Sequence, residues 1–264
     1  MAVLIHGERI VPAWLAAARH LAGCKGNTER NLVLEIASPG ELNAQDRDVI
    51  GAVDAALQQH SPGLSVQTVA STIFPNNLYK LDKRPAFYDS YVNAITRGQK
   101  VGTWGTYALR MIRRVARNGK TTYNPLEALV RKLQKSKDGR CYQAVYELGV
   151  IDVEFDLEDD GFGFELPLYD PGADRNMPRN MPCLSHLSFK VTQGKLDLTA
   201  MYRSHWYGQR VLGNLIGLNN LHNFVAVESG FERGPLTVIS THALLDMQSL
   251  GGAKATRALL NSFG

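Results

Sequence analysis

Cysteine is scarce in this sequence, and its positions match no disulfide framework. The 264 residues include three cysteines, Cys24, Cys141 and Cys183, an odd number at wide spacing. This pattern argues against a disulfide scaffold and against a zinc site built from paired cysteines. It fits a reducing compartment, so we expect a cytoplasmic protein.

Long apolar runs and targeting signals are also missing. No stretch reaches the roughly 18 apolar residues that a membrane-spanning helix needs. Residues 1–8 lack the apolar segment of a secretory signal. We therefore expect neither a membrane span nor secretion.

The short motifs that hold phosphates or metals in many proteins are absent as well. The sequence has no Walker-type or dinucleotide-binding glycine loop, and no HExxH-like pair or other metal spacing, so we expect no metal site. Its net charge is +4. This mild basicity fits a phosphate-bearing ligand but is weak for a nucleic-acid partner, which needs basic residues clustered on one face. A slightly basic solvated surface explains the charge equally well.

The order of helical and strand patterns predicts an α+β fold. Helices are expected where apolar residues recur every three or four positions, and strands where apolar and polar residues alternate. The expected helices are 9–22, 46–59, 84–97, 124–135 and 211–227, and the expected strands are 31–36, 141–150, 184–191, 196–202 and 236–240. A turn at Gly194 joins two alternating strands into a hairpin. Residues 1–264 show no internal repeat, and we expect a single domain with a mixed β-sheet flanked by helices.

The residues suited to chemistry are concentrated in the last third of the chain. Cys183 follows Pro182, Arg203-Ser204 begins 20 residues later, and Asn214 lies eleven residues beyond Arg203. His242 follows further along. A cysteine after a proline is weak evidence by itself, because free cysteine is among the most buried residue types. Several such residues in a fixed order are far more specific.

In this order and spacing the chain resembles the thymidylate synthases and pyrimidine-nucleotide hydroxymethylases. The shared features are a Pro-Cys nucleophile, a strand pair, an Arg-Ser, and an asparagine or aspartate on the next helix. Residues 182–226 align with these motifs without gaps, and the first half of the chain matches only in fragments. The resemblance implies a thymidylate synthase-like fold and a homodimer. It also implies a pyrimidine nucleoside 5′-monophosphate as substrate and 5,10-methylenetetrahydrofolate as cofactor.

The resemblance makes Cys183 the nucleophile. Pyrimidine C5 reacts poorly until a thiolate adds to C6 and converts the ring into an enolate, and a thiolate can leave again afterwards. A nearby arginine would raise the thiolate fraction. Arg203 is the candidate for this role, and its planar fork would bind the nucleotide phosphate, to which Ser204 would also donate. Arg203 could instead be a surface arginine, and Ser204 could cap the end of a strand.

Asn214 occupies the position that reads the base in this family. Its carboxamide can accept from uracil N3–H and donate to O4, which favours uridylate, whereas a carboxylate would suit the amino group of cytosine. The alternative is a helix cap. His242 matches a histidine that contacts the sugar, although a lone histidine near a strand end is more often structural. The family usually has a tyrosine two residues later, where this chain has Leu244.

Four further positions match the family or depart from it. Trp206 replaces an aspartate that holds the folate pterin in many synthases, and it could stack on a ring or simply pack. Arg140 resembles an arginine that holds the phosphate in the other subunit's site, and it could equally be a solvated turn residue. Arg30 resembles an N-terminal phosphate-loop arginine. Tyr107 lies in a segment resembling the family's Tyr-Gly-x-x-Arg region, whose tyrosine helps to move a proton at C5.

Three functions stay open at this point. Reduction of the transferred carbon by the folate gives a methyl group, as in thymidylate synthase, and attack by water gives a hydroxymethyl group. Asn214 favours uridylate and therefore methylation, while Trp206 and Leu244 favour a specialised relative. The third possibility is a non-catalytic nucleotide-binding protein on the same fold. Cys183 argues against it, because binding alone needs no nucleophile.

Overall fold

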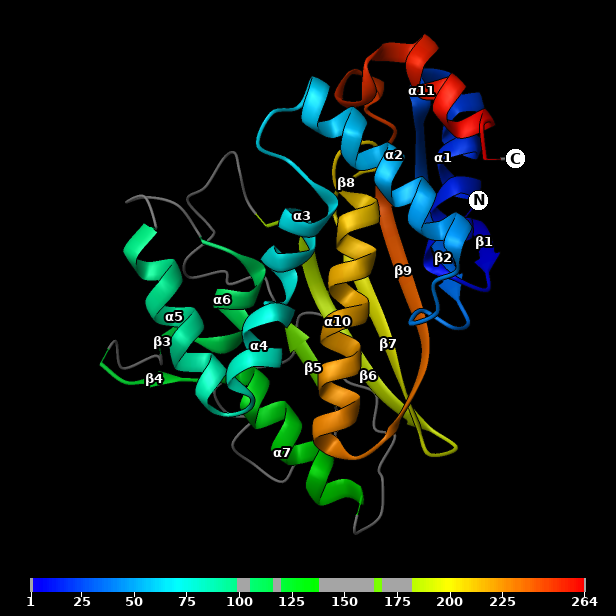
Figure 1. Ribbon diagram of the computed structural model, residues 1–264. Helices are drawn as coiled ribbons and strands as arrows, with labels where there is room; N and C mark the ends of the chain where they lie inside the picture. The colour runs from blue at the N-terminus through cyan, green and yellow to red at the C-terminus, as the bar shows by residue number, and fades with distance from the viewer. Residues whose placement is uncertain (1, 99–104, 116–119, 138–163, 168–181, 264) are drawn as a thin grey trace. The chain divides into compact units, whose positions relative to one another are not determined.

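The computed structural model describes residues 2–98, 105–115, 120–137, 164–167 and 182–263. Within these ranges helices flank a mixed, multi-stranded sheet (Figure 1), and the predicted α+β fold is confirmed. The strand expected at 141–150 lies outside the described residues. None of the helices in the described ranges is long and apolar enough to cross a membrane.

The chain divides into two compact units. Unit 1 comprises residues 1–71, 199–219 and 234–264, and unit 2 comprises residues 72–198 and 220–233. Both units are therefore built from segments far apart in the sequence. A single domain over residues 1–264 stays a prediction.

The main sheet has hydrogen-bonded strands in the order β1-β2-β9-β7-β6-β5, with β8 beside β9. β1 is parallel to β2, β2 is antiparallel to β9, and β8 is parallel to β9. β5 is antiparallel to β6, and β3 and β4 form a separate antiparallel pair. The strand bounds are β1 Val3–Gly7, β2 Thr28–Ile36, β3 Arg114–Val115, β4 Thr122–Tyr123, β5 Phe164–Pro167, β6 Leu184–Thr192, β7 Lys195–Tyr202, β8 His205–Trp206 and β9 Glu232–Leu244.

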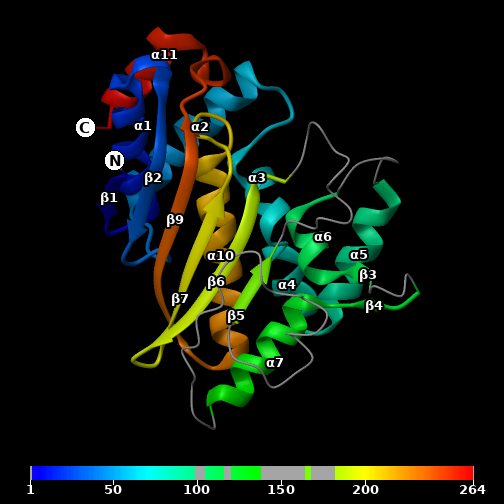
Figure 2. The same cartoon turned by 180° about the vertical axis from the view of Figure 1, so that it is seen from behind.

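Unit 1 is built on helices α1 (Ile10–Gly23), α2 (Ala44–His60) and α11 (Gly252–Asn261). α1 lies beside β1 and β2 in both views (Figure 2). Its apolar face includes Trp14, which is fully buried and donates its indole N–H to the carbonyl of Tyr207 at 3.0 Å. Pairing the one polar atom of a large buried side chain removes the cost of burying it.

In unit 2 successive helices pack each on the next, namely α4 (Asn76–Asp82), α5 (Ala86–Gly98), α6 (Tyr107–Ile112) and α7 (Pro125–Lys137). An aromatic cluster fills the core, with Phe74, Phe87 and Phe224 in mutual contact. Beside it Arg84 makes a two-pronged ion pair with Glu127, at 2.7 and 2.8 Å. The β6–β7 hairpin is confirmed, and its two turn residues, Gln193 and Gly194, have φ of 52° and 79°, as a tight hairpin turn requires.

The expected helices and strands inside the described ranges are all found. The longest is α10 (Val211–Ser229), a helix that is apolar nearly all round. The structure adds elements that the sequence patterns did not predict, namely β1, β5, β8, the pair β3–β4, α4, α6, α11 and α3 (Val66–Ile73), together with the short 3₁₀ helices Lys25–Asn27 and Met247–Leu250. Most of these are too short to show a periodic pattern.

Candidate functional site

The expected site residues fall in two groups. Cys183 and Tyr107 belong to unit 2, and the other described residues, Arg30, Arg203, Ser204, Trp206, Asn214 and His242, belong to unit 1. Arg140 lies outside the described residues. The roles of all these residues stay predictions, and the geometry within each unit shows what each group can do.

In unit 2 the structure brings Cys183 next to Tyr107. The backbone N–H of Cys183, a half-buried residue just before β6, donates to the Tyr107 hydroxyl at 3.1 Å, and the N–H of Leu184 reaches the same oxygen at 3.4 Å. The Tyr107 side chain is buried at the start of α6. Thr106 caps this helix by accepting from the N–H of Leu109 at 3.1 Å. The tyrosine therefore fixes the backbone that carries the thiol.

In unit 1 Asn214 is tied to a buried histidine. Its Nδ2 lies 3.0 Å from Nε2 of His205, and Nδ1 of His205 lies 2.9 Å from the hydroxyl of Ser240. The Tyr202 ring stacks on His205 with 3.7 Å between the ring centroids. All three members of the chain Asn214–His205–Ser240 are buried. The imidazole is thus held by a stacked ring on its face and by a hydrogen-bond partner at each of its two nitrogens.

His205 is neutral in this setting. Its complete burial lowers the pKa to about 3, because the charged ring would lose its hydration. A neutral imidazole has one donor nitrogen and one acceptor nitrogen. With Nε2 accepting from the Asn214 amide, Nδ1–H donates to Ser240, and both contacts are satisfied. This arrangement fixes which end of the Asn214 carboxamide faces the protein.

Basic and imidazole groups gather near the end of β9. Arg30 on β2 is the cross-strand partner of His242 on β9, and both side chains are exposed. Thr241 donates its hydroxyl to the carbonyl of Arg203 at 3.0 Å, which ties the Arg203 backbone to the same stretch of β9. Ser204 is half-buried beside Arg203. Exposed arginines and a histidine on neighbouring backbone are suited to an anionic group such as a phosphate.

The two departures from the family pattern are neighbours in space. Trp206 on β8 is the register partner of Leu244 on β9, and 42% of Trp206 is exposed. An exposed indole beside a leucine offers a flat apolar surface and has no carboxylate or phenol to present. It can stack against a ring, but it cannot accept a hydrogen bond from one.

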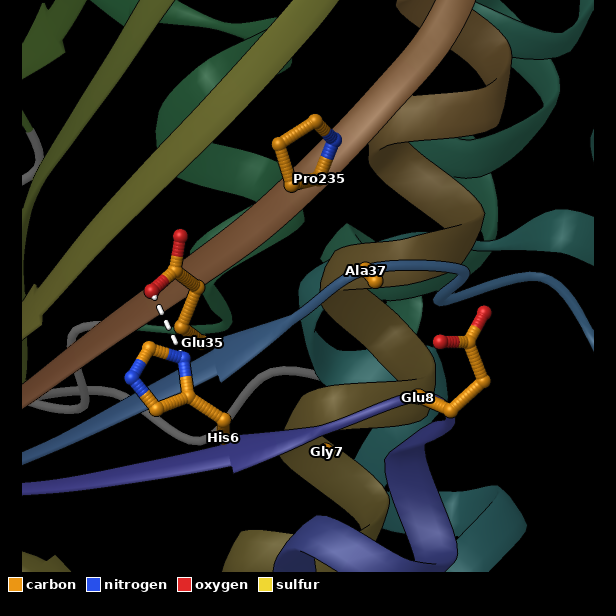
Figure 3. A pocket seen from close by; sticks show the side chains of 6 residues that line it. All are labelled: His6, Gly7, Glu8, Glu35, Ala37 and Pro235. Atoms are coloured by element: carbon orange, nitrogen blue, oxygen red, sulfur yellow. Dashed lines mark ion pairs between the residues drawn. The ribbon is translucent and has the colours of Figure 1, made fainter.

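A separate cavity of about 440 Å³ opens in unit 1 beside β1 and β2 (Figure 3). It is lined by His6, Gly7, Glu8, Glu35, Ala37 and Pro235. Nδ1 of His6 pairs with Glu35 across the two strands at 3.0 Å. None of the expected site residues lines this cavity, and two of its walls carry carboxylates, so it does not suit a phosphate.

The contact of His205 with Asn214 was not predicted from the sequence. The signal available was the position of His205 next to Ser204, nine residues before Asn214. That spacing alone does not reveal the contact, because one residue lies on β8 and the other on α10. Their proximity follows from the packing of α10 against β8, which only the folded structure shows.

Comparison with known proteins agrees with the motifs. The chain is 28% identical over 138 residues to a protein of Methanosarcina acetivorans named "Putative thymidylate synthase", a match covering 52% of this chain and 51% of that protein. The protein of the same name from Methanosarcina mazei is 25% identical over 156 residues, 59% of each chain. The one from Methanosarcina barkeri is 40% identical over 63 residues, 24% of this chain and 29% of that protein.

The chain thus spans only part of the relatives that it matches, about half of the first of them. No family model matches it. A mixed α/β fold and several archaeal relatives of this kind nevertheless point the same way. They support a thymidylate synthase-like family for the chain, and the resemblance expected from its motifs is confirmed.

Proposed function

We propose that this protein transfers a one-carbon unit from 5,10-methylenetetrahydrofolate to C5 of a pyrimidine nucleoside 5′-monophosphate. The observation that carries the proposal is the contact of Tyr107 with the backbone of Cys183, at 3.1 Å. These residues are 76 positions apart, and the motifs assign both to the same reaction. We further propose a cytoplasmic homodimer in which Arg140 serves the partner's phosphate site.

The reaction begins at Cys183. Its thiolate forms a bond to C6 of the base, and the electrons of the C5–C6 double bond move toward the C4 oxygen. The enolate carbon C5 then attacks the one-carbon unit of the folate. Tyr107 would carry away the C5 proton, and the folate nitrogen would leave the transferred carbon. Hydride from the folate or a water molecule would then complete the methyl or hydroxymethyl group as the sulfur departs and the ring is restored. The thiolate is thus regenerated.

The substrate proposed is a uridylate. Asn214 donates one amide hydrogen to neutral His205, which turns its carboxamide oxygen toward the ligand side as an acceptor. Uracil N3–H supplies the matching donor, and the second amide hydrogen can reach O4. Arg203 and Arg30, helped by Ser204, would hold the phosphate, and His242 the sugar.

Hydroxymethylation is the second candidate, and the Trp206–Leu244 pair favours it. Where many synthases hold the pterin with a carboxylate, this chain presents an apolar surface that is 42% exposed at Trp206. A folate held less rigidly would reduce the transferred carbon less efficiently and leave it open to water. Methylation and hydroxymethylation share the addition of Cys183 to C6 and the attack of C5 on the one-carbon unit. They differ in whether hydride or water then adds to the transferred carbon.

Tritium release from 5-tritiated nucleotides tests the proposal, because the C5 hydrogen is lost only after addition at C6. The four substrates are dUMP, UMP, dCMP and CMP, each with methylenetetrahydrofolate. We expect release from a uracil nucleotide, none from Cys183→Ser, and retained nucleotide binding by that variant in calorimetry. The mass of the product distinguishes a methyl from a hydroxymethyl group. Tight nucleotide binding by the native protein with no tritium release would support a non-catalytic binding protein instead.

A further inference from the structure

Three potential metal ligands that have no assigned role in the reaction converge in unit 1. His20 lies in the last turn of α1, Cys24 ends that helix, and Glu29 lies near the start of β2. Their ligand atoms all lie within 4.8 Å of one another. The turn between them contains Gly26 and Asn27, both with positive φ, which folds the strand back beside the helix end.

The distances match the edges of a tetrahedron. Cys24 Sγ lies 3.5 Å from His20 Nε2 and 3.8 Å from Glu29 Oε2, and the nitrogen and oxygen are 3.2 Å apart. Around a tetrahedral zinc ion with ordinary bond lengths, sulfur lies about 3.6 Å from a nitrogen or oxygen ligand, and nitrogen lies about 3.3 Å from oxygen. Each observed separation is within a few tenths of an ångström of these edges.

A hydrogen-bonded catalytic triad does not explain the arrangement. A triad uses both nitrogens of the histidine, one toward the cysteine and the other toward the carboxylate. Here Nε2 alone faces both the sulfur of Cys24 and the carboxylate of Glu29. A neutral nitrogen that donates to the carboxylate has no lone pair for the thiol, whose proton can go instead to the backbone carbonyl of His20 at 3.3 Å. A cation at the centre would accept a lone pair from each of the three atoms.

The surroundings favour such a cation. One carboxylate oxygen of Glu29 is held by the backbone N–H of Arg30 at 3.0 Å, which leaves the other oxygen directed at His20 and Cys24. Anchoring of a ligand by a neighbouring group is characteristic of metal sites. A thiolate, a carboxylate and a neutral imidazole carry two negative charges, so a divalent ion makes the set neutral. The His20 and Glu29 side chains are 34% and 28% exposed, which lets an ion enter.

We propose that His20, Cys24 and Glu29 bind one zinc ion, with water as the fourth ligand. The ion would lock the last turn of α1 to the start of β2, immediately before Arg30. This proposal departs from the expectation of no metal site, which considered only the spacing of ligands along the sequence. His20 and Cys24 are four residues apart on a helix, one turn, and Glu29 arrives from a strand. The inference does not depend on the proposed reaction.

Binding should release a proton. Partial burial and the nearby Glu29 carboxylate raise the pKa of the Cys24 thiol. Zinc displaces the thiol proton, and affinity should rise with pH. The same binding should raise the melting temperature as zinc concentration increases, because zinc binds the folded chain.

Cobalt(II) titration of the metal-free full-length protein tests the site, followed by displacement with zinc. We expect one ion per chain, visible bands of tetrahedral intensity and a thiolate-to-cobalt charge-transfer band. Cys24→Ser should abolish that band and weaken zinc binding at least about a hundredfold, the upper end for loss of a mere supporting group. Glu29→Gln should weaken binding while keeping the band. His6→Ala removes a histidine that also pairs with a glutamate, at 3.0 Å, and should change nothing.

The control cysteine is Cys183, and Cys183→Ser should bind cobalt as the native protein does. A charge-transfer band that survives in Cys24→Ser, or disappears in Cys183→Ser, overturns the proposal. So does a native protein that binds less than half an equivalent of zinc at saturating concentration. None of these readouts requires enzymatic turnover, so the outcome is independent of the result for tritium release.

Discussion

At the scale of single residues, His205 orients the carboxamide of Asn214. An asparagine alone can flip to suit either base, because its two ends look alike in size. In the structure Nδ2 faces a neutral, fully buried imidazole, which holds the carboxamide with its nitrogen toward His205. The proposed base choice would therefore depend on two residues, Asn214 that would touch the base and His205 that orients it.

Asn214→Asp should shift the preference from uracil toward cytosine. The ionised carboxylate has only acceptors, so it repels uracil O4 and suits the cytosine amino group. We expect the ratio of kcat/KM for cytosine over uracil to rise by about 1–3 kcal/mol, the value of one buried unpaired group. Tritium release from both bases measures it. His205→Leu leaves the native asparagine free to flip. It should therefore reduce the preference for uracil over cytosine, measured as the ratio of the two kcat/KM values. An unchanged ratio in both variants would remove Asn214 from base recognition.

Arg203→Ala should weaken binding of nucleotide but hardly affect the nucleoside. The arginine is exposed, and the contact that Thr241 makes with its backbone carbonyl does not involve the side chain that is removed. The expected loss for the monophosphate is about 1.5–3 kcal/mol, the value of a charged hydrogen bond. Calorimetry with both ligands measures it. Equal losses for nucleotide and nucleoside would indicate a structural role.

At the scale of elements, the long α10 could be predicted and its neighbours could not. A run that is apolar nearly all round predicts a buried helix, and Val211–Ser229 confirms it. The partner of its first turn, α3, has eight residues and too few turns to show a pattern. Likewise the Asn214–His205 contact is a product of tertiary packing, and no spacing rule along the chain reports it.

Gly213→Ala should destabilise the protein, because α3 approaches α10 closely at that point. A Cβ on Gly213 would lie 2.6 Å from Cβ of Val69 and 2.7 Å from the carbonyl of Val66. Overpacking of this kind costs about 1–3 kcal/mol. The matched control is Gly51→Ala inside α2, where a Cβ meets nothing within 4 Å. It should be neutral or stabilising, and urea unfolding of the two variants should separate them; equal stabilities would contradict the close approach.

At the scale of the whole molecule, the α+β architecture could be predicted because helical and strand patterns both occur along the chain, mostly in separate runs. The sheet order could not, since β2 pairs with β9 across some two hundred residues. β1 was missed for a related reason. Its five residues alternate only half-buried positions with exposed ones, and the parallel pairing with β2 completes it.

Stability should fall as the pH drops from about 7 to about 5. Burial lowers the pKa of His205 to about 3 and that of His222 to about 4, from an ordinary value of 6.5. The unfolded chain therefore takes up protons below pH 6.5 that the folded chain refuses. Above that pH neither histidine lowers the free energy of unfolding. Below it, each one lowers the free energy of unfolding by up to about 1.4 kcal/mol per pH unit. Urea unfolding across this range measures the slope, which His222→Gln should roughly halve. A flat profile would show that neither ring is held neutral.

The central claim is that Cys183 forms a bond to C6 of a pyrimidine nucleotide, and mass spectrometry of a trapped complex tests it most directly. A 5-fluorinated uridylate added with methylenetetrahydrofolate blocks the loss of the C5 substituent, so the sulfur cannot leave. The account predicts a mass increase equal to nucleotide plus folate, located by peptide mapping on Cys183 and absent in Cys183→Ala. An adduct on Cys24 or Cys141, or none on a protein that demonstrably binds the nucleotide, would contradict it.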